Sequence, residues 1–302
     1  MHVQHRLGSI VGSSLLQHPE EQQRSFPGGA VAYLRPTVRY LFTIESHVYA
    51  MAIAGSVLLA FFPFLVFILS LTRNLLPGSG VAEMVLIGVK DVLPNDPGLV
   101  TFVTRNLSAA VSSRGGVEVF SAVLLVISSQ GIFMPLEVAL NRLWVFSDDR
   151  SYWSNQLTSF AFAMACGLLA VGAAVLSSAN VNVLAGLFGR LLLVSELAKL
   201  LILKFASLPF VMAILVLIYW KLPHGPVRLG TIAPVAALTA VALEISKNLY
   251  LWAWPLLKVR EAYGPFFISV TLLLGGFLSA MIVLAGGEIC ARRSRELESD
   301  ES

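Results

Sequence analysis

Two ionisable residues, Glu244 and Lys247, lie inside a long apolar stretch at about residues 229–254. A charge at membrane depth costs roughly 2.5–3.5 kcal/mol on insertion scales, so such residues normally face a helix bundle or a polar cavity. Asn248 follows Glu244 by four residues, and all three therefore share one face of a helix. They could supply a polar patch along a substrate or proton pathway. The alternatives are an internal ion pair that fixes helix packing, or a lysine that extends toward the membrane surface.

Four further polar residues lie near the ends of predicted helices. Glu137, Asn141 and Arg142 end one apolar stretch, and Glu288 lies near the end of the last. Glu137 and Arg142 are five residues apart and need not pair with each other, which leaves room for partners on other helices. A charge network between the two helices at the cytoplasmic side would form a gate. A static clasp between them is the alternative.

Residues that would support catalysis or ATP use do not occur in a recognisable arrangement. The five histidines show no HxH or HxHxD spacing, and His2 and His5 lie in a polar tail where a chance pairing is the simpler explanation. Cys166 and Cys290 follow no CxxC spacing. The chain also lacks the phosphate-binding and nucleophile motifs GxxxxGK[ST], GxGxxG and GxSxG. We therefore expect no enzyme activity, no metal and no cofactor.

The composition is that of an integral membrane protein. Hydrophobic residues make up 56% of the chain and charged residues 13%, and the mean hydropathy is +0.77. The formal net charge of +3 is small and the basic residues are scattered, which argues against nucleic-acid binding. Membrane lipid is the partner that this composition predicts.

The elements that must position these residues are membrane-spanning helices. We predict an all-α, polytopic fold with six spans, because a helix needs about 20 apolar residues to cross a hydrocarbon core of roughly 30 Å. The six stretches cover approximately residues 47–71, 117–140, 157–178, 202–220, 229–254 and 264–290. Residues 181–204 are also rich in leucine but are broken by Arg190, Glu196 and Lys199, so we treat them as an interfacial or partly buried helix and leave the count open by one.

Other segments flank these spans. Residues 1–29 are polar and are expected to be a disordered cytoplasmic tail. The transmembrane domain is expected to cover residues 30–292, beginning with an interfacial helix at residues 30–46. Residues 72–116 show two helical apolar periodicities around a turn, which predicts an amphipathic hairpin between the first and second spans. Residues 293–302 form a charged cytoplasmic tail.

Lysine and arginine asymmetry predicts the orientation. With the N-terminus inside, the cytoplasmic segments hold eleven Lys and Arg residues and the opposite side holds nine. Basic residues within long structured loops count for little in this rule. We therefore expect both termini in the cytoplasm.

Small residues and prolines recur within the predicted spans. The last span contains four small residues at close-packing spacing: Gly275, Gly276, Ser279 and Ala280. Packing within one chain is the default interpretation, and a homo-oligomer is the alternative. Four prolines would interrupt the spans: Pro63, Pro135, Pro209 and Pro234. Interrupted helices form the sites of many transporters, although proline is also common in ordinary membrane helices.

An ordered set of short segments carries a resemblance to a known family. The segments are residues 137–144 (EVALNRLW), 150–153 (RSYW), 219–223 (YWKLP) with Gly230, 243–247 (LEISK), 262–264 (AYG) and 286–288 (GGE). Their order over roughly residues 30–292 resembles that of the YihY/BrkB family of bacterial inner-membrane proteins. The resemblance implies a six-helix inner-membrane protein with cytoplasmic termini. Members have carried the name ribonuclease BN, but the histidine pattern of this chain argues against a metal-dependent nuclease.

Two functions follow as hypotheses. The first is a transporter or exporter of a lipid-like or small amphiphilic substrate without its own ATPase, since no energising domain is present in this sequence. The second is a membrane scaffold that binds a partner protein through the hairpin at residues 72–116. A ribonuclease or intramembrane enzyme is the least supported alternative, because no catalytic residues assemble in the pattern.

Overall fold

The computed structural model describes residues 30–75, 94, 98, 101, 105, 116–146, 157–159, 161–169, 172, 207–225 and 227–301. The chain divides into two units, Met1–Pro36 and Thr37–Ser302. In the first unit, residues 30–36 form the first part of helix α1 (Ala30–Leu41). All that follows concerns the second unit, to which Thr37 and the rest of α1 belong.

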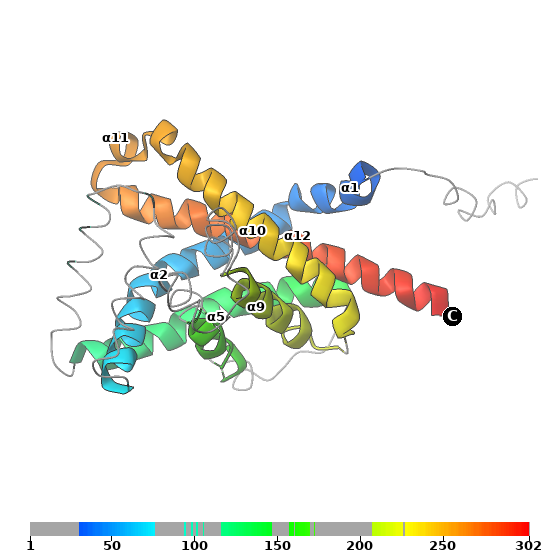
Figure 1. The fold of residues 1–302 in the computed structure, drawn as a ribbon, viewed down its shortest axis with the longest axis horizontal. Coiled ribbons are helices and arrows are strands. Elements are labelled where there is room, and N and C mark those ends of the chain that lie inside the picture. Colours follow the sequence, from blue (N-terminus) through cyan, green and yellow to red (C-terminus); the bar gives the residue numbers. More distant parts are fainter. Residues whose placement is uncertain are drawn as a thin grey trace, which may run out of the picture. The chain divides into compact units, whose positions relative to one another are not determined.

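The described part of the chain is helical and contains no strand (Figure 1). After α1, the elements in chain order are α2 (Ile44–Leu75), α5 (Gly116–Trp144), α9 (Leu208–Lys221), α10 (Leu229–Leu257), α11 (Val259–Tyr263), the 3-10 turn η3 (Gly264–Phe266) and α12 (Phe267–Glu301). The prediction of an all-α protein is therefore confirmed for the described residues.

Four helical stretches are long and apolar enough to cross a membrane. They are Ile44–Ser70, Val119–Trp144, Leu229–Leu257 and Val259–Leu297. These correspond to the first, second, fifth and sixth predicted spans. The last helix does not end near residue 290, because α12 continues to Glu301 through the charged segment.

The other two predicted spans are described only in part. Leu157–Leu169 and α9 are shorter apolar helices. The 14 residues of α9 rise about 21 Å, which is less than the roughly 30 Å of the hydrocarbon core. The residues between these two helices lie mostly outside the described part of the chain, as do the tail at 1–29, the 181–204 segment and most of the 72–116 hairpin.

The boundary between the interfacial helix and the first span differs from the prediction. The interfacial helix expected at residues 30–46 ends at Leu41, and α2 begins at Ile44. The break is stabilised by polar side chains, since the Thr43 hydroxyl donates to the carbonyl of Tyr40 at 2.7 Å and the buried Ser46 hydroxyl contacts the carbonyls of Leu41 and Thr43 at 2.9 Å.

The prediction that four prolines interrupt the spans is wrong. Helices α2, α5 and α10 continue through Pro63, Pro135 and Pro234. Pro209 lies in the first turn of α9, where the missing N–H costs no intrahelical bond. Interrupted helices therefore give no support to a transport site here.

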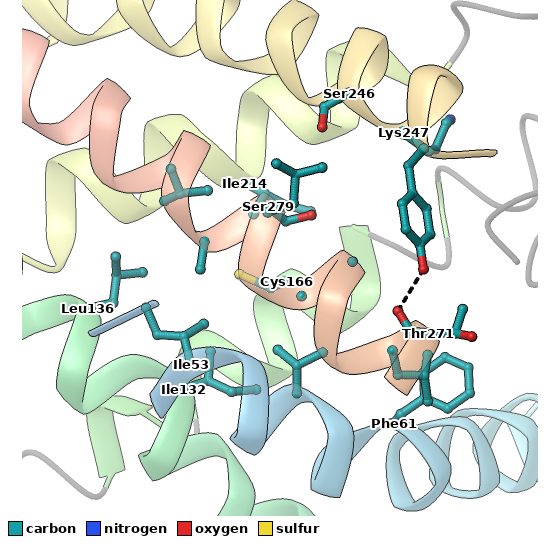
Figure 2. A pocket seen from close by; sticks show the side chains of 18 of the residues that line it. Ile53, Phe61, Ile132, Leu136, Cys166, Ile214, Ser246, Lys247, Thr271 and Ser279 are labelled. Atoms are coloured by element: carbon teal, nitrogen blue, oxygen red, sulfur yellow. Dashed lines mark hydrogen bonds between the residues drawn. The ribbon is translucent and has the colours of Figure 1, made fainter. Parts of the chain in front are cut away.

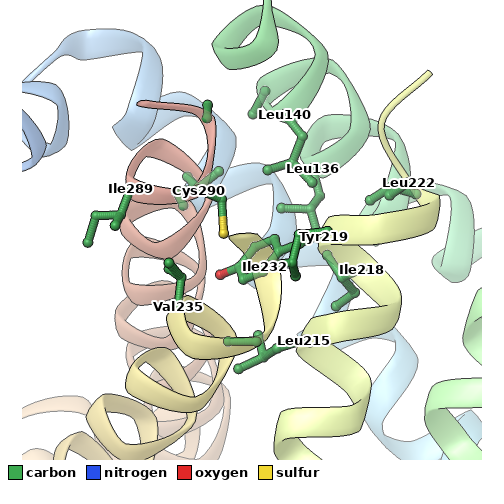
Figure 3. Packing of buried hydrophobic residues seen from close by; sticks show 14 of the residues in the cluster. Leu136, Leu140, Leu215, Ile218, Tyr219, Leu222, Ile232, Val235, Ile289 and Cys290 are labelled. Atoms are coloured by element: carbon green, nitrogen blue, oxygen red, sulfur yellow. The ribbon is translucent and has the colours of Figure 1, made fainter. Parts of the chain in front are cut away.

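Helix α12 is central to the packing and contacts α2, α5, α9 and α10. One apolar cluster joins α5, α9, α10 and α12 around the buried side chains of Leu140, Tyr219 and Ile232 (Figure 3). The Tyr219 hydroxyl donates to the carbonyl of Val283 at 2.7 Å, so its polar atom is satisfied in the apolar surroundings. A second cluster joins the later part of α2 to the end of α10 and the start of α12, and includes Leu69, Trp254 and Phe267.

The second unit carries apolar side chains on its outer surface, as a membrane bundle does. Helix α10 carries an exposed apolar stripe at spacings of three and four: Leu238, Val241, Ile245, Leu249, Trp252 and Leu256. Its buried residues include Thr231, Thr239 and Glu244. In water such a stripe would expose a large apolar patch, whereas acyl chains are a suitable solvent for it.

Candidate functional site

Glu244, Lys247 and Asn248 form one compact group on α10, as the sequence spacing predicts. The Lys247 Nζ lies 2.7 Å from Oε1 and 2.8 Å from Oε2 of Glu244. The Asn248 amide donates to Glu244 Oε1 at 3.1 Å and to the Glu244 backbone carbonyl at 2.7 Å. Lys247 thus neutralises the charge of the Glu244 carboxylate, and both Lys247 and Asn248 donate hydrogen bonds to it.

The two charges of this group differ in exposure. The Glu244 side chain is 8% exposed, whereas that of Lys247 is 32% exposed. An ammonium group has three N–H donors and no acceptor. The buried carboxylate therefore faces its own helix neighbours, while the lysine presents a positively charged donor outward.

Lys247 lines a partly open cavity of about 410 Å³ (Figure 2). The walls come from α2, α5, α9, α10 and α12, with Cys166 and the buried Pro94 also contributing. Most of the lining is apolar, and the polar side chains in it include Ser246, Lys247 and Ser279. Tyr250 also lines it and donates from Oη to the carbonyl of Thr271 at 3.0 Å.

The cavity lies between the two packed clusters. Along α2, the lining residues Val57 and Phe61 fall between Ala50 of the first cluster and Leu65 of the second. Along α12, the lining runs from Thr271 to Val283, between Ile268 of the second cluster and Leu284 of the first. Protein interiors pack densely with few voids, so this opening is a distinct feature of the bundle. A second cavity of about 280 Å³ shares several wall residues with it, including Val57, Ile132 and Cys166.

A second polar group joins the end of α5 to the loop between α9 and α10. His224 Nε2 lies 3.0 Å from Oε1 of Glu137, and both side chains are less than a tenth exposed. Asn141 Oδ1 accepts the backbone N–H of His224 at 2.9 Å, and its Nδ2 contacts the ring Nδ1. Because Nδ2 can only donate, a hydrogen bond to Nδ1 requires the neutral tautomer with its proton on Nε2, the nitrogen nearer the carboxylate.

Glu288 belongs to a third polar group, between α12 and the end of α1. The buried Thr37 hydroxyl donates to Glu288 Oε2. Arg292 Nε lies 3.3 Å from Glu288 Oε1, and its Nη2 donates to Thr37 Oγ1 at 3.2 Å. This group attaches α1 to α12 through one neutral and two charged side chains.

Arg142 is exposed and pairs with Glu45, whose Oε1 lies 2.9 Å from Nη2. The four residues suggested as one gate or clasp therefore belong to three separate groups. Glu137 and Asn141 contact His224, Glu288 contacts Thr37 and Arg292, and Arg142 contacts Glu45. A link between α5 and α12 comes instead from Arg295, whose Nη1 donates to the carbonyl of Leu143 at 2.6 Å. Near Glu45, burial together with Tyr49 and Glu45 raises the pKa of Tyr40 to about 12, so this hydroxyl stays protonated.

The sequence does not single out four members of these groups: Thr37, Glu45, His224 and Arg292. It shows His224 only as one of five scattered histidines, and a threonine in an amphipathic helix carries no distinguishing signal. Among the described residues, no group of three or more His, Cys, Asp or Glu side chains could hold a metal ion.

Comparison with known proteins supplies the family. The model of the family described as virulence factor BrkB matches residues 43–302. A UPF0761 membrane protein of Acinetobacter baylyi (strain ATCC 33305 / BD413 / ADP1) is 26% identical over 196 residues, which cover 61% of this chain. The match covers 44% of that relative, so the chain spans less than half the length of the curated protein it resembles. No solved structure matches. Its long apolar helices make this a transmembrane protein, and the family match over most of its length shows that the chain belongs to the BrkB virulence-factor family.

Proposed function

We propose that this protein moves an amphiphilic, lipid-like molecule across or out of the bacterial inner membrane without an ATPase of its own. The observation that carries the proposal is the cavity of about 410 Å³ between the two packed clusters, with Lys247 in its lining. A largely apolar site with a few polar groups is typical of ligand-binding pockets of this size. An amphiphile fits it because the apolar walls accept a chain and the polar side chains accept a polar head.

The proposed orientation has six spans and both termini in the cytoplasm. One end of the bundle gathers the end of α5, the loop before α10 and the last turns of α12, as the contacts of His224 and Arg295 require. This end carries several basic residues: Arg142, Lys221, Arg228, Arg292, Arg293 and Arg295. The turn after α10 carries Lys258 and Arg260. The positive-inside rule favours the first end as cytoplasmic.

A flux measurement tests the proposal. The purified full chain is reconstituted into vesicles that contain fluorescent single-chain or two-chain lipids, and dithionite quenching reports their movement between leaflets. Wild type should accelerate movement of at least one probe over protein-free vesicles. If no probe moves faster, the proposal fails, and a scaffold that binds a partner through residues 72–116 becomes the better explanation.

Two glycine variants locate the pathway. A Cβ at Gly275 would lie 3.8 Å from the Tyr250 ring, and Gly275 lines the cavity, so Gly275→Leu should fill it and slow movement. Gly55 on α2 has open space at its Cβ position and lines neither described cavity. Gly55→Leu is the matched control and should retain wild-type flux.

A further inference from the structure

Lys247 is the one charged residue among those that line the described cavity. Glu244 is buried, contacts Lys247 and Asn248, and does not line the cavity. Glu244 contacts Lys247 through two oxygens, and an ammonium group carries a third N–H donor. A head group that accepts hydrogen bonds therefore finds a charged donor, and a cationic head group meets repulsion.

The dimensions of the cavity fit one acyl chain. A methylene group takes up about as much volume as a water molecule, roughly 30 Å³, so 410 Å³ holds about a dozen carbons. The α12 wall from Thr271 to Val283 rises about 18 Å, close to the roughly 15 Å of half a hydrocarbon core. Figure 2 shows Lys247 and Thr271 on one side of the cavity, with Ile53 and Leu136 on the other.

We infer that this cavity binds a single-chain anionic amphiphile, a long-chain fatty acid whose carboxylate contacts Lys247 and whose chain lies along α2 and α12. The inference rests on the proposed function, because it names the substrate class of the same site. Hydrogen bonds between an ammonium and a carboxylate are stronger than those to a neutral oxygen, so the acid should be preferred over an alcohol of equal length.

Photo-crosslinking of the purified full chain in a non-ionic detergent tests this inference at equilibrium, without transport. The probe is tetradecanoic acid with a diazirine at the chain end, and cross-linked peptides are mapped. Tetradecanoic acid, tetradecan-1-ol and tetradecylamine compete for the site. The acid should compete at a concentration about tenfold or more below those of the alcohol and the amine.

Substitutions assign the preference to Lys247. Lys247→Met alone leaves the Glu244 carboxylate without its counter-charge and could impair folding, so the double variant Glu244→Gln with Lys247→Met removes both charges together. It should bind the acid and the alcohol within about twofold of each other. Lys221→Met is the matched control, because Lys221 lies over the Trp220 ring on α9 and does not line the cavity. It should keep the tenfold preference.

The possible outcomes separate this inference from the proposed function. Cross-links at cavity residues, with the acid preferred in wild type and Lys221→Met but not in the double variant, support it. Equal competition by all three compounds at the same residues overturns the anionic specificity and leaves a site for amphiphiles in place. Preference for the amine, preference retained by the double variant, or cross-links outside the cavity also overturns the inference.

Discussion

At the residue scale, several polar side chains of the described helices contact one another in small groups within an apolar bundle. Glu137 and His224 are both buried, and Asn141 fixes His224 through its backbone and its ring. A buried polar group without a partner costs about 1–3 kcal/mol, and more when it is charged. The group can therefore act as a clasp that stabilises the bundle, or as a contact that breaks when the protein changes conformation.

Neighbouring residues on α5 distinguish these roles. Asn141→Leu removes the acceptor of the His224 N–H and should lower the free energy of unfolding by about 1–3 kcal/mol, measured as a lower melting temperature in detergent. Arg142→Leu, one residue further, removes a pair in which both side chains are at least half exposed and should change the melting temperature little. An unchanged melting temperature in Asn141→Leu with altered lipid flux would contradict the clasp and favour a gate.

The same residues show how far the sequence predicts the site. The contacts within Glu244, Lys247 and Asn248 follow from spacings of three and four on one helix, so they could be predicted. The partner of Glu137 comes from a residue 87 positions away (137 to 224), and that of Glu288 from one 251 positions away. These contacts depend on helix packing, which no local pattern encodes. The cavity could not be predicted from the sequence either, because it lies between two clusters that form only when the helices pack.

At the element scale, the apolar content of the sequence predicts where the long helices lie, but it does not predict where they end. Residues 293–301 were expected to be a charged tail, yet they continue α12. Arginine and glutamate are good helix formers, and Arg292 pairs with Glu288 four residues earlier, so the helix needs no apolar environment to continue. In the same way, Pro63 and Pro135 marked expected breaks, but the surrounding packing keeps α2 and α5 helical.

Close packing of α12 gives a prediction that compares one substitution at two sites. A Cβ at Gly286 would overlap the hydroxyl oxygens of Thr239 and Tyr219. Both are fixed, since Tyr219 is fully buried and each donates to a backbone carbonyl. Gly286→Ala should therefore destabilise the protein by about 1–3 kcal/mol.

Gly275→Ala is the control in the same helix, because its Cβ would make only an ordinary contact at 3.8 Å. Alanine also has the higher helix propensity, so this variant should be as stable as wild type or slightly more stable. Thermal unfolding of both purified variants gives the comparison. Equal melting temperatures would show that α12 does not approach Tyr219 as closely as the structure places it.

At the scale of the whole molecule, the bundle carries apolar residues on its outer surface as well as in its core, and it buries several polar residues. Glu244 is buried beside the exposed stripe on α10, and buried Ser128, Ser129 and Thr271 lie on other helices. Such a surface is stable in acyl chains, and it fixes which residues can be reached from water: those at the two ends of the bundle. The ends differ in their basic residues, and the proposed orientation rests on this difference.

Single cysteines at the two ends test that orientation. Glu261, in the turn after α10, has a side chain 74% exposed, and Ser299 is exposed near the end of α12. A membrane-impermeant maleimide should label Glu261→Cys in spheroplasts and Ser299→Cys only in inside-out vesicles, because the proposed orientation places the arginine-rich end of α12 in the cytoplasm. Wild type is the control for the native thiols, of which Cys290 is fully buried. Labelling of Ser299→Cys in spheroplasts would reverse the orientation, and would place the basic end of the bundle outside.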